Sequence, residues 1–348
     1  MPTPEDSYAR TPMTLDHTDV VIVGAGPIGL ELAVAFQREG IDYLQIEASA
    51  IGSTIAWYPL QMPFHSNAER LSIAGVPIQT ADQHKPTREE YLAYLRSVVL
   101  QFQLRIRLHE RVEAIERIGE RFRLRTSRGV IEARRVVLAI GAMHRPRLLG
   151  IPGEGLPHVS HYFHEPHPFF AQKLLIVGGK NSAVETAIRC QRAGAHVTLS
   201  YRGTDFDPAH VKFWLLPELR SMVRDDRVRV LPGTTPVEIR ERSVLLSTSD
   251  GLQEIDADAV LLMTGYEQDP SLLRMAGVTL QGDAQAPVYN EATMETDVPG
   301  VFVAGTAVAG SPVGKVRVIV ETCHVHVPRI VAAIKGKRAD IAGGPTDE

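Results

Sequence analysis

The chain has 348 residues, 44% of them hydrophobic, which is enough for two domains that each bury a core of their own. Its 37 lysines and arginines face 41 aspartates and glutamates, and this balance argues against nucleic-acid binding, because phosphate backbones select a basic surplus. Two cysteines, a polar first segment and no long apolar run together predict a cytoplasmic protein that does not enter a membrane.

The first predicted unit begins with a short apolar strand at 20–23, a glycine-rich turn at 24–29 and a helix at 30–37. A second strand at 41–46 ends directly before Glu47. In the turn, which reads GAGPIG, the first glycine permits a tight bend, the second lets the backbone approach a pyrophosphate, and the third lets helix and strand pack closely. A carboxylate at Glu47 accepts ribose hydroxyls and disfavours a 2′-phosphate, so the unit is predicted to bind a dinucleotide.

The segment 51–86 is irregular and rich in proline and aromatic residues, and it is too long for a simple connection unless it serves a ligand. A capping box at Thr87–Glu90 then predicts a helix through about Phe102. Strands are expected within 104–126 and over 130–140.

A proline-containing break at 151–153 separates this unit from a second one that repeats its opening. The repeat consists of a strand at 174–177, a glycine turn and a helix from about Ser182. Later strands are expected at 195–200, 227–231, 244–248 and 259–263, and a final strand at 300–305 that leads into a helix from about Val316 to Ile334.

The second glycine turn is degenerate, because Lys180 replaces its second glycine and Ala183 its third. We interpret Lys180 as a phosphate ligand, although a solvated loop lysine would give the same sequence. The strand that follows ends at Tyr201 and Arg202, with no acid in the place that Glu47 occupies in the first unit. Arginine suits a 2′-phosphate and tyrosine can stack on adenine, which favours NADPH here, the alternative being an exposed arginine on a turn.

Several motifs resemble those of the thioredoxin-reductase-like flavoproteins, and within them most those of the bacillithiol disulfide reductase group. They are VGGKNSAVE at Val177–Glu185, YRGTDFDP at Tyr201–Pro208, WLLPEL at Trp214–Leu219, MTGY at Met263–Tyr266, and a terminal motif from Glu291 to Gly305 that carries an extra Ala292. The resemblance covers nearly the whole chain and implies a homodimer that binds FAD and NADPH.

The fold class expected from these features is α/β, with two Rossmann-like dinucleotide-binding domains of three-layer ββα architecture. The NADPH domain, at 166–287, is inserted into an FAD domain formed by 1–165 and 288–348, in which 1–17 is expected to be a disordered tail. The predicted FAD contacts are Gly24, Gly26, Pro27, Ile28, Gly29, Glu47, Ala48, Trp57, Gly141, Gly305 and Thr306. The predicted NADPH contacts are Gly178, Gly179, Lys180, Asn181, Ser182, Tyr201, Arg202 and Gly265.

The chain departs from the family at its reactive positions. It has no C-x-x-C pair, which excludes the dithiol relay of thioredoxin reductases, and Ile28 stands where the bacillithiol group has a cysteine. Thr306 stands where thioredoxin reductases have an aspartate that holds the ribityl chain. No catalytic residue is therefore assigned: Cys323, His324 and His326 are candidates, with packing the expected role for the thiol, as for Cys190.

Four histidines recur at every third position, at His158, His161, His164 and His167. Because they lie in a proline-rich loop without a helix to align them, no metal site is expected.

The function predicted from the sequence is an NADPH-dependent FAD oxidoreductase that passes hydride from NADPH to flavin and on to a low-molecular-weight disulfide, another electron acceptor or a redox partner protein. One alternative is a flavin-dependent monooxygenase, suggested by the residues Gly141–Pro146 and the turn Ile151–Gly153. Another is a non-catalytic redox sensor that binds FAD and NADPH.

Overall fold

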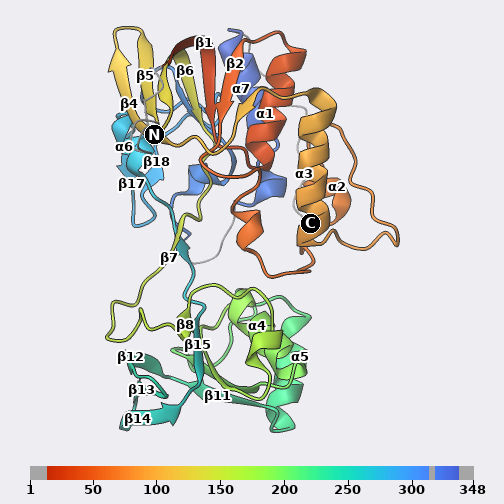
Figure 1. Cartoon of the computed structure of the whole chain (residues 1–348), viewed down its shortest axis with the longest axis vertical. Coiled ribbons are helices and arrows are strands. Elements are labelled where there is room, and N and C mark those ends of the chain that lie inside the picture. Colours follow the sequence, from red (N-terminus) through yellow and green to blue (C-terminus); the bar gives the residue numbers. More distant parts are fainter. Residues whose placement is uncertain (1–13, 313–317, 337–348) are drawn as a thin grey trace, which may run out of the picture. The chain divides into compact units, whose positions relative to one another are not determined.

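The computed structural model describes residues 14–312 and 318–336, which form two compact units (Figure 1). Among these residues, unit 1 contains the chain up to Ala56, the segment Pro63–His144 and everything from Gln268 on. Unit 2 contains Trp57–Met62 and Arg145–Glu267. The chain therefore passes between the units at four points.

Unit 1 combines a large sheet with helices on it. Its strands are β1 (Thr14–Val23), β2 (Tyr43–Ile46), β3 (Ile106–Arg107), β4 (Val112–Ile118), β5 (Arg121–Thr126), β6 (Gly129–Leu138), β17 (Leu280–Gln281), β18 (Ala286–Pro287) and β19 (Val301–Val303). Its helices are α1 (Pro27–Arg38), α2 (Ala68–Leu71), α3 (Arg88–Phe102), α6 (Ser271–Met275) and α7 (His326–Ile334), with short 3-10 helices η4 (Gly305–Ala309) and η5 (Val320–Thr322). A further 3-10 turn, Ile55–Trp57, lies where the chain first leaves this unit.

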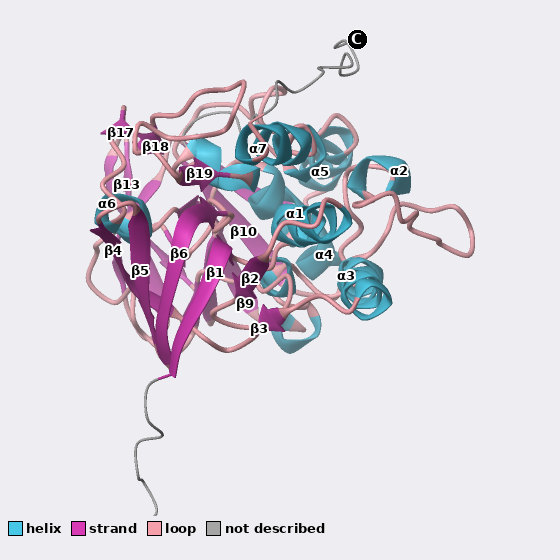
Figure 2. Cartoon of the chain, turned by 90° about the horizontal axis from the view of Figure 1, so that it is seen from above, coloured by secondary structure: helices cyan, strands magenta, loops and turns pink. Residues whose placement is uncertain are grey.

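The sheet of unit 1 has seven strands in the order β3-β2-β1-β6-β5-β4, with β19 also paired to β6 (Figure 2). The pairs β1–β2, β1–β6 and β6–β19 are parallel, whereas β4, β5 and β6 form an antiparallel meander. Val20, Val21 and Ile22 are fully buried, as expected for a central parallel strand covered on both faces. Leu138 pairs with both Val23 and Val303, so the carboxyl ends of these strands are level.

The helix predicted from the capping box is confirmed as α3. The hydroxyl of Thr87 accepts the Glu90 backbone N–H at 3.3 Å, and the Glu90 carboxylate accepts the Thr87 N–H at 2.8 Å. These bonds satisfy donors that the start of a helix otherwise leaves unpaired. Helix α3 packs beside α1, next to the sheet (Figure 2).

Unit 2 repeats the strand, glycine turn and helix arrangement. Its strands are β7 (Arg145–Pro146), β8 (Val159–Ser160), β9 (Lys173–Val177), β10 (His196–Tyr201), β11 (Val228–Pro232), β12 (Thr235–Ile239), β13 (Ser243–Thr248), β14 (Gly251–Asp256), β15 (Ala259–Leu262) and β16 (Tyr266–Glu267). Its helices are α4 (Asn181–Arg192), α5 (Leu215–Arg224) and the 3-10 turn η3 (His167–Phe169). A five-stranded parallel sheet has the order β11-β10-β9-β15-β8, and β12-β13-β14 form an antiparallel sheet.

The expected α/β fold class, with two dinucleotide-binding units, is confirmed, but the chain divides at other points than those predicted. The division falls at 144/145 and 267/268, not at 165/166 and 287/288. The physical reason is that β7 pairs with β16 and that β8 joins the parallel sheet of unit 2. The excursion Trp57–Met62 is held to unit 2 by two hydrogen bonds, from Leu60 N–H to the His164 carbonyl and from the Arg189 guanidinium to the Leu60 carbonyl, each at 2.8 Å.

Both ends of the predicted unit 1 also need correction. Residues 14–17 of the expected tail belong to β1, where Thr14 pairs with Gly129; the rest of that tail, 1–13, lies outside the described residues. The last helix does not run from Val316, since α7 begins only at His326 and is preceded by η5. The β-branched run at 318–320 disfavours a helix there, and residues 316 and 317 lie outside the described part of the chain.

Candidate functional site in each of the two units

The three glycines of the first glycine turn have different roles, because a side chain would meet different surroundings at each. Gly24 has φ +111°, and a Cβ there would lie 2.4 Å from the Ala139 carbonyl oxygen. A Cβ on Gly29 would lie 2.3 Å from the Gly24 carbonyl oxygen, so both positions need glycine for internal packing. Gly26 differs, because a Cβ there would meet nothing within 4 Å. Open space at Gly26, at the start of α1, is what a pyrophosphate approaching the backbone requires.

Glu47, directly after β2, fixes this turn. Its side chain is 8% exposed, and its two carboxylate oxygens accept the backbone N–H groups of Ala25 and Ser49, each at 2.8 Å. The oxygen that accepts the Ser49 N–H also accepts the Ser53 hydroxyl at 3.5 Å, and the oxygen that accepts the Ala25 N–H can take a further hydrogen bond. The carboxylate beside Ala48 is thus oriented and still able to take ribose hydroxyls.

The parallel strands bring the other predicted FAD contacts of unit 1 to the same edge of the sheet. A Cβ on Gly141, which follows β6, would lie 3.8 Å from the Thr306 hydroxyl oxygen. A Cβ on Gly305 would lie 3.4 Å from the Ile28 Cβ in the first turn of α1, beside Pro27. The structure therefore gathers Gly24–Gly29, Glu47, Ala48, Gly141, Gly305 and Thr306 at the carboxyl ends of β1, β2, β6 and β19, where ligands of open α/β sheets bind.

Trp57 is the exception among the predicted FAD residues, because it belongs to unit 2. Its ring contacts Tyr162 edge-on, with 5.7 Å between ring centroids, and lies tilted against Tyr266 at 6.5 Å. Burial, with the neighbouring phenols of Tyr162 and Tyr58, raises the pKa of Tyr266 to about 12. The tryptophan is thus part of an aromatic cluster of unit 2, and its contact with FAD stays a prediction.

The three candidate catalytic side chains are all engaged in structure. Cys323 is fully buried, and burial raises the pKa of its thiol to about 12. His324 binds the Glu31 carboxylate at 2.7 Å and the Arg70 carbonyl at 3.0 Å. The ring of His326 is 6% exposed and accepts the Gly305 N–H at 3.1 Å, so it orients a predicted flavin contact.

Neither cysteine of the chain is a reactive thiol in this structure. Cys190 lies fully buried in the core of unit 2, and burial raises its pKa also to about 12. Thiolates, rather than thiols, attack disulfides. Ile28, at the position for which the family resemblance implies a cysteine, is 4% exposed and chemically inert. The chain itself therefore supplies no cysteine relay.

The second glycine turn opens α4 in unit 2, and its predicted contacts converge as well. Val177, Ser200 and Leu262 are register partners, so the ends of β9, β10 and β15 are level. A Cβ on Gly178 would lie 2.7 Å from the Met263 carbonyl oxygen, two residues before Gly265. The edge thus gathers Gly178, Gly179, Lys180, Asn181, Ser182, Tyr201, Arg202 and Gly265.

Positive charge collects at this turn. The pKa of Lys180 is lowered by partial burial and by the nearby guanidinium groups of Arg147 and Arg202. Mutual repulsion among cations at the N-terminus of a twelve-residue helix is relieved by an anion, which makes this a suitable place for phosphate groups. Arg147 was missed by the sequence analysis, because it is brought to the turn by the pairing of β7 with β16.

Tyr201 has less freedom than the sequence analysis expected. Its ring stacks on Phe206 with 5.0 Å between centroids and an 8° interplanar angle, and a Cβ on Gly179 would lie 2.1 Å from it. One face of the ring is therefore already covered, which leaves at most the other for an adenine.

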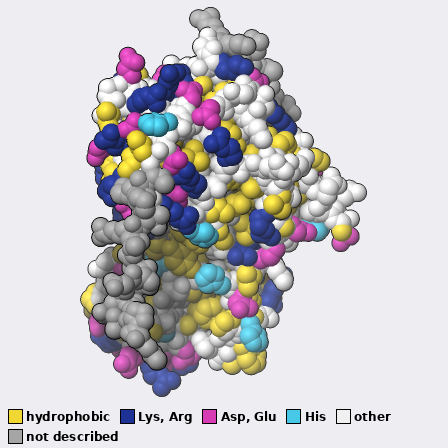
Figure 3. All heavy atoms as spheres, turned by 45° about the horizontal axis from the view of Figure 1, so that its top comes forward, with side chains coloured by type: hydrophobic (Ala, Val, Ile, Leu, Met, Phe, Trp, Pro, Cys, Tyr) yellow, Lys and Arg dark blue, Asp and Glu magenta, His cyan; other side chains and the backbone are white. Residues whose placement is uncertain are grey.

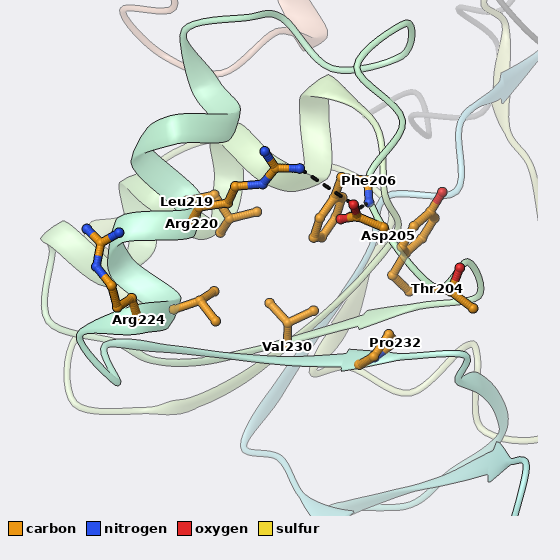
Figure 4. Close-up of a pocket in the computed structure, with 10 residues that line it drawn as sticks. Thr204, Asp205, Phe206, Leu219, Arg220, Arg224, Val230 and Pro232 are labelled. Carbon is orange, nitrogen blue, oxygen red and sulfur yellow. Dashed lines mark hydrogen bonds and ion pairs between the residues drawn. The ribbon is translucent and has the colours of Figure 1, made fainter.

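An open groove of about 410 Å³, partly lined by Tyr201, lies in unit 2 (Figure 4). Its mostly apolar lining comes from the loop after β10, from α5 and from β11, and Arg220 pairs with Asp205 at 3.6 Å across it. Tyr201 is the one predicted NADPH residue that lines the groove, so the groove is not the centre of the nucleotide turn.

Two buried glutamines were also missed by the sequence analysis. Gln45 is fully buried, and its amide donates to the Gly24 carbonyl at 2.8 Å beneath the first glycine turn. A polar residue within the otherwise apolar strand YLQI was a signal that could have revealed it. Gln268 holds the turn at Gly141, and no local pattern marks it.

Other sites find little support in the described part of the chain. No cluster of three or more histidine, cysteine or acidic side chains suited to a metal occurs there, so the repeated histidines do not converge. No helix among those residues combines the length and the apolar character needed to span a bilayer. On the face shown in Figure 3, basic and acidic side chains lie interspersed.

Comparison with known proteins agrees with two dinucleotide sites. Residues 21–305 match the family described as pyridine nucleotide-disulphide oxidoreductase, and the chain belongs to this family. It is an oxidoreductase that depends on FAD and on a nicotinamide nucleotide. The Bacilliredoxin reductase Bdr of Bacillus subtilis is 36% identical over 316 residues, covering 90% of this chain and 96% of that protein.

Two other similar proteins are named for different electron acceptors, one for a disulfide and one for ferredoxin. A solved structure of the Bacillithiol Disulfide Reductase Bdr from Bacillus cereus has a TM-score of 0.88 and 35% identity, covering 92% of this chain and 99% of the other. The Ferredoxin--NADP reductase of Thermus thermophilus is 30% identical over 314 residues, covering 85% of this chain and 86% of that protein.

Proposed function

We propose that this protein is an NADPH-dependent FAD oxidoreductase whose reduced flavin passes electrons directly to an acceptor, without a cysteine of the chain as intermediate. FAD would occupy the turn of unit 1, and NADPH that of unit 2. The preference for NADPH over NADH is supported by the positive charges of Lys180, Arg147 and Arg202, which lie close together near the start of α4. Glu47 stands at the corresponding place in unit 1 and disfavours a 2′-phosphate.

The chain's own residues would bind and orient the two cofactors. Glu47 and the open backbone at Gly26 would hold the adenosine and pyrophosphate part of FAD, while Gly141, Gly305 and Thr306 would contact the rest of it. When bound, FAD supplies a two-electron carrier that accepts hydride from the nicotinamide. We also propose that the protein is a homodimer and that it acts in the cytoplasm.

The proposed acceptors are a low-molecular-weight disulfide or an electron-carrier protein. A disulfide is suggested by the relatives named bacilliredoxin and bacillithiol disulfide reductases, but the burial of Cys190 and Cys323 removes the thiol route. That observation favours a second candidate, a ferredoxin-like carrier that takes electrons from flavin without covalent chemistry, as the name of the Thermus relative suggests. Monooxygenase activity and a purely sensory role are rivals that the same experiment addresses.

The test is anaerobic mixing of the purified flavoprotein with NADPH or with NADH, followed by flavin absorbance. Rapid bleaching by NADPH and slow bleaching by NADH support the cofactor assignment. The reduced protein is then mixed separately with a disulfide, with ferredoxin and with oxygen, and the rate at which flavin colour returns identifies the acceptor.

Each rival predicts a different result. A protein that bleaches but is reoxidised only by oxygen, with incorporation of oxygen into an organic substrate, is a monooxygenase. A protein that binds both nucleotides and never bleaches is a sensor, and the oxidoreductase proposal is then wrong.

A further inference from the structure

The side chain of Gln268 is a buried amide with a fixed orientation. It is 2% exposed, and its Nε2 group donates to the carbonyl oxygens of Gly141 at 2.8 Å and Ala307 at 3.1 Å. Carbonyl oxygens only accept hydrogen bonds, so the amide nitrogen must face them. Its backbone N–H donates in addition to the Ser311 hydroxyl at 2.9 Å.

This amide joins two segments that are far apart in the sequence. Gly141 lies three residues after the end of β6, and Ala307 lies within η4, directly after β19. Both segments carry predicted FAD contacts, namely Gly141, Gly305 and Thr306. One side chain therefore sets the spacing between the two turns that would hold the flavin.

The other end of the amide is unsatisfied. The Oε1 atom of Gln268 is buried and has no hydrogen-bond donor among the described residues. A buried amide oxygen without a donor is unfavourable, so a bound molecule commonly supplies one. The ribityl chain of FAD carries hydroxyl donors of this kind.

Gln268 also stands at a junction of the chain. It is the first residue of unit 1 after unit 2, and His144 is the last residue before it. His144 accepts the Asp269 N–H at 2.7 Å and contacts the Ile140 carbonyl through its other ring nitrogen at 2.7 Å. The segment that leaves unit 1 after His144 and the segment that returns at Gln268 are thus both hydrogen-bonded within unit 1, beside the Gly141 turn.

We propose that Gln268 is a positioning residue of the flavin site, which holds the Gly141 turn and η4 at the spacing that FAD requires. The inference rests on FAD binding by unit 1, as given under the proposed function. Gln268 is the residue whose side chain bonds both segments, at Gly141 and at Ala307, and so fixes the distance between them.

The test compares FAD binding to full-length apoprotein carrying Gln268→Met or Gln285→Met. Methionine matches glutamine in length but donates no hydrogen bond. Gln285 is a matched control, because its exposed amide also donates to a backbone carbonyl, that of Gly282 at 3.2 Å. We expect Q268M to raise the Kd for FAD by roughly tenfold and to alter the visible bands of the bound flavin, with Q285M unchanged.

If Q268M binds FAD as tightly as the wild type does and its flavin spectrum is unchanged, the inference is overturned. It is also overturned if Q268M loses as much stability without FAD as with FAD, because the role of Gln268 is then purely structural. If Q268M does not fold, Gln268→Asn gives the same comparison, since its amide is too short to reach both carbonyls. Wild-type protein that binds no FAD contradicts the proposed function itself, whereas wild-type binding with an indifferent Q268M contradicts this inference alone.

Discussion

The imidazole of His326 accepts a hydrogen bond from the backbone N–H of Gly305 at 3.1 Å, across 21 residues of sequence. The accepting Nδ1 atom must be unprotonated, so the bond requires a neutral ring. Burial, together with the positive charges of Arg329 and His324, lowers the pKa of His326 to about 4. The first turn of α7 is thereby tied to the segment that follows β19.

This bond predicts an acid-sensitive stability. Because the folded pKa of His326 lies near 4 and the unfolded value near 6.5, the unfolded chain binds the extra proton first. Stability should fall as the pH drops from about 6.5 to about 4, by up to roughly 3 kcal/mol. Urea unfolding followed by circular dichroism at fixed FAD concentration measures this slope, and His326→Gln should flatten it.

His324 provides a control of opposite sign. The Glu31 carboxylate raises the pKa of this ring, so its contribution is present at low pH and is lost as the pH rises through the folded pKa. Because this contribution is complete below the unfolded pKa of about 6.5, His324→Gln should change the pH profile above that value and leave the acid loss between about 6.5 and 4 in place, whereas His326→Gln removes that loss. Identical pH profiles for the two variants would show that the burial of His326 is not what governs the slope.

The three glycines of the first turn should separate folding from cofactor binding. Gly26 has φ −75° and open space around it, so Gly26→Val should leave apoprotein stability within about 0.5 kcal/mol. It should weaken FAD binding by at least roughly tenfold, because the added side chain occupies the approach of the pyrophosphate. Gly24→Ala should instead destabilise the apoprotein by about 1–3 kcal/mol.

Urea unfolding of the apoproteins and titration with FAD measure the two effects independently. Wild-type FAD affinity in Gly26→Val would place the pyrophosphate somewhere other than this turn.

Arg202 should distinguish the two nicotinamide nucleotides. Its guanidinium is expected to pair with the 2′-phosphate, so Arg202→Leu should raise the KM for NADPH by roughly 10- to 100-fold and leave that for NADH nearly unchanged. Arg220→Leu is the matched control, since Arg220 is also exposed in unit 2 but lines the groove of Figure 4. Steady-state kinetics at several salt concentrations check this, and an equal effect on both nucleotides contradicts the assignment.

Electron transfer should survive removal of both cysteines. Because Cys190 and Cys323 are fully buried with pKa values near 12, neither should react with a thiol reagent at pH 8 in the folded protein. The double variant to alanine should lose about 1–3 kcal/mol of stability through lost packing. It should keep the wild-type rates of flavin reduction and reoxidation, and a selective loss of disulfide turnover would restore a thiol to the mechanism.

The sequence was informative where the physics is local. A glycine turn between a buried strand and a helix, with Glu47 directly after the next strand, predicts the geometry of that turn. In the same way, Thr87 with Glu90 predicts the start of α3. Contacts between distant segments could not be read in this way. Gln268, Arg147 and the affiliation of Trp57 depend on which strands pair after the chain has left unit 1 and returned. The unit boundaries failed for the same reason.

The order of segments along the chain also sets an order of assembly. Unit 2 ends at Glu267, whereas unit 1 still lacks β19, which pairs with β6 in its sheet, and α7 with His326. All of unit 2 has therefore been synthesised before the residues around Gly305 emerge from the ribosome. The flavin site proposed for unit 1 can therefore form only after β19 and the Gly305 segment have been made, so cells short of riboflavin should accumulate chains in which unit 2 is folded while unit 1 lacks its cofactor.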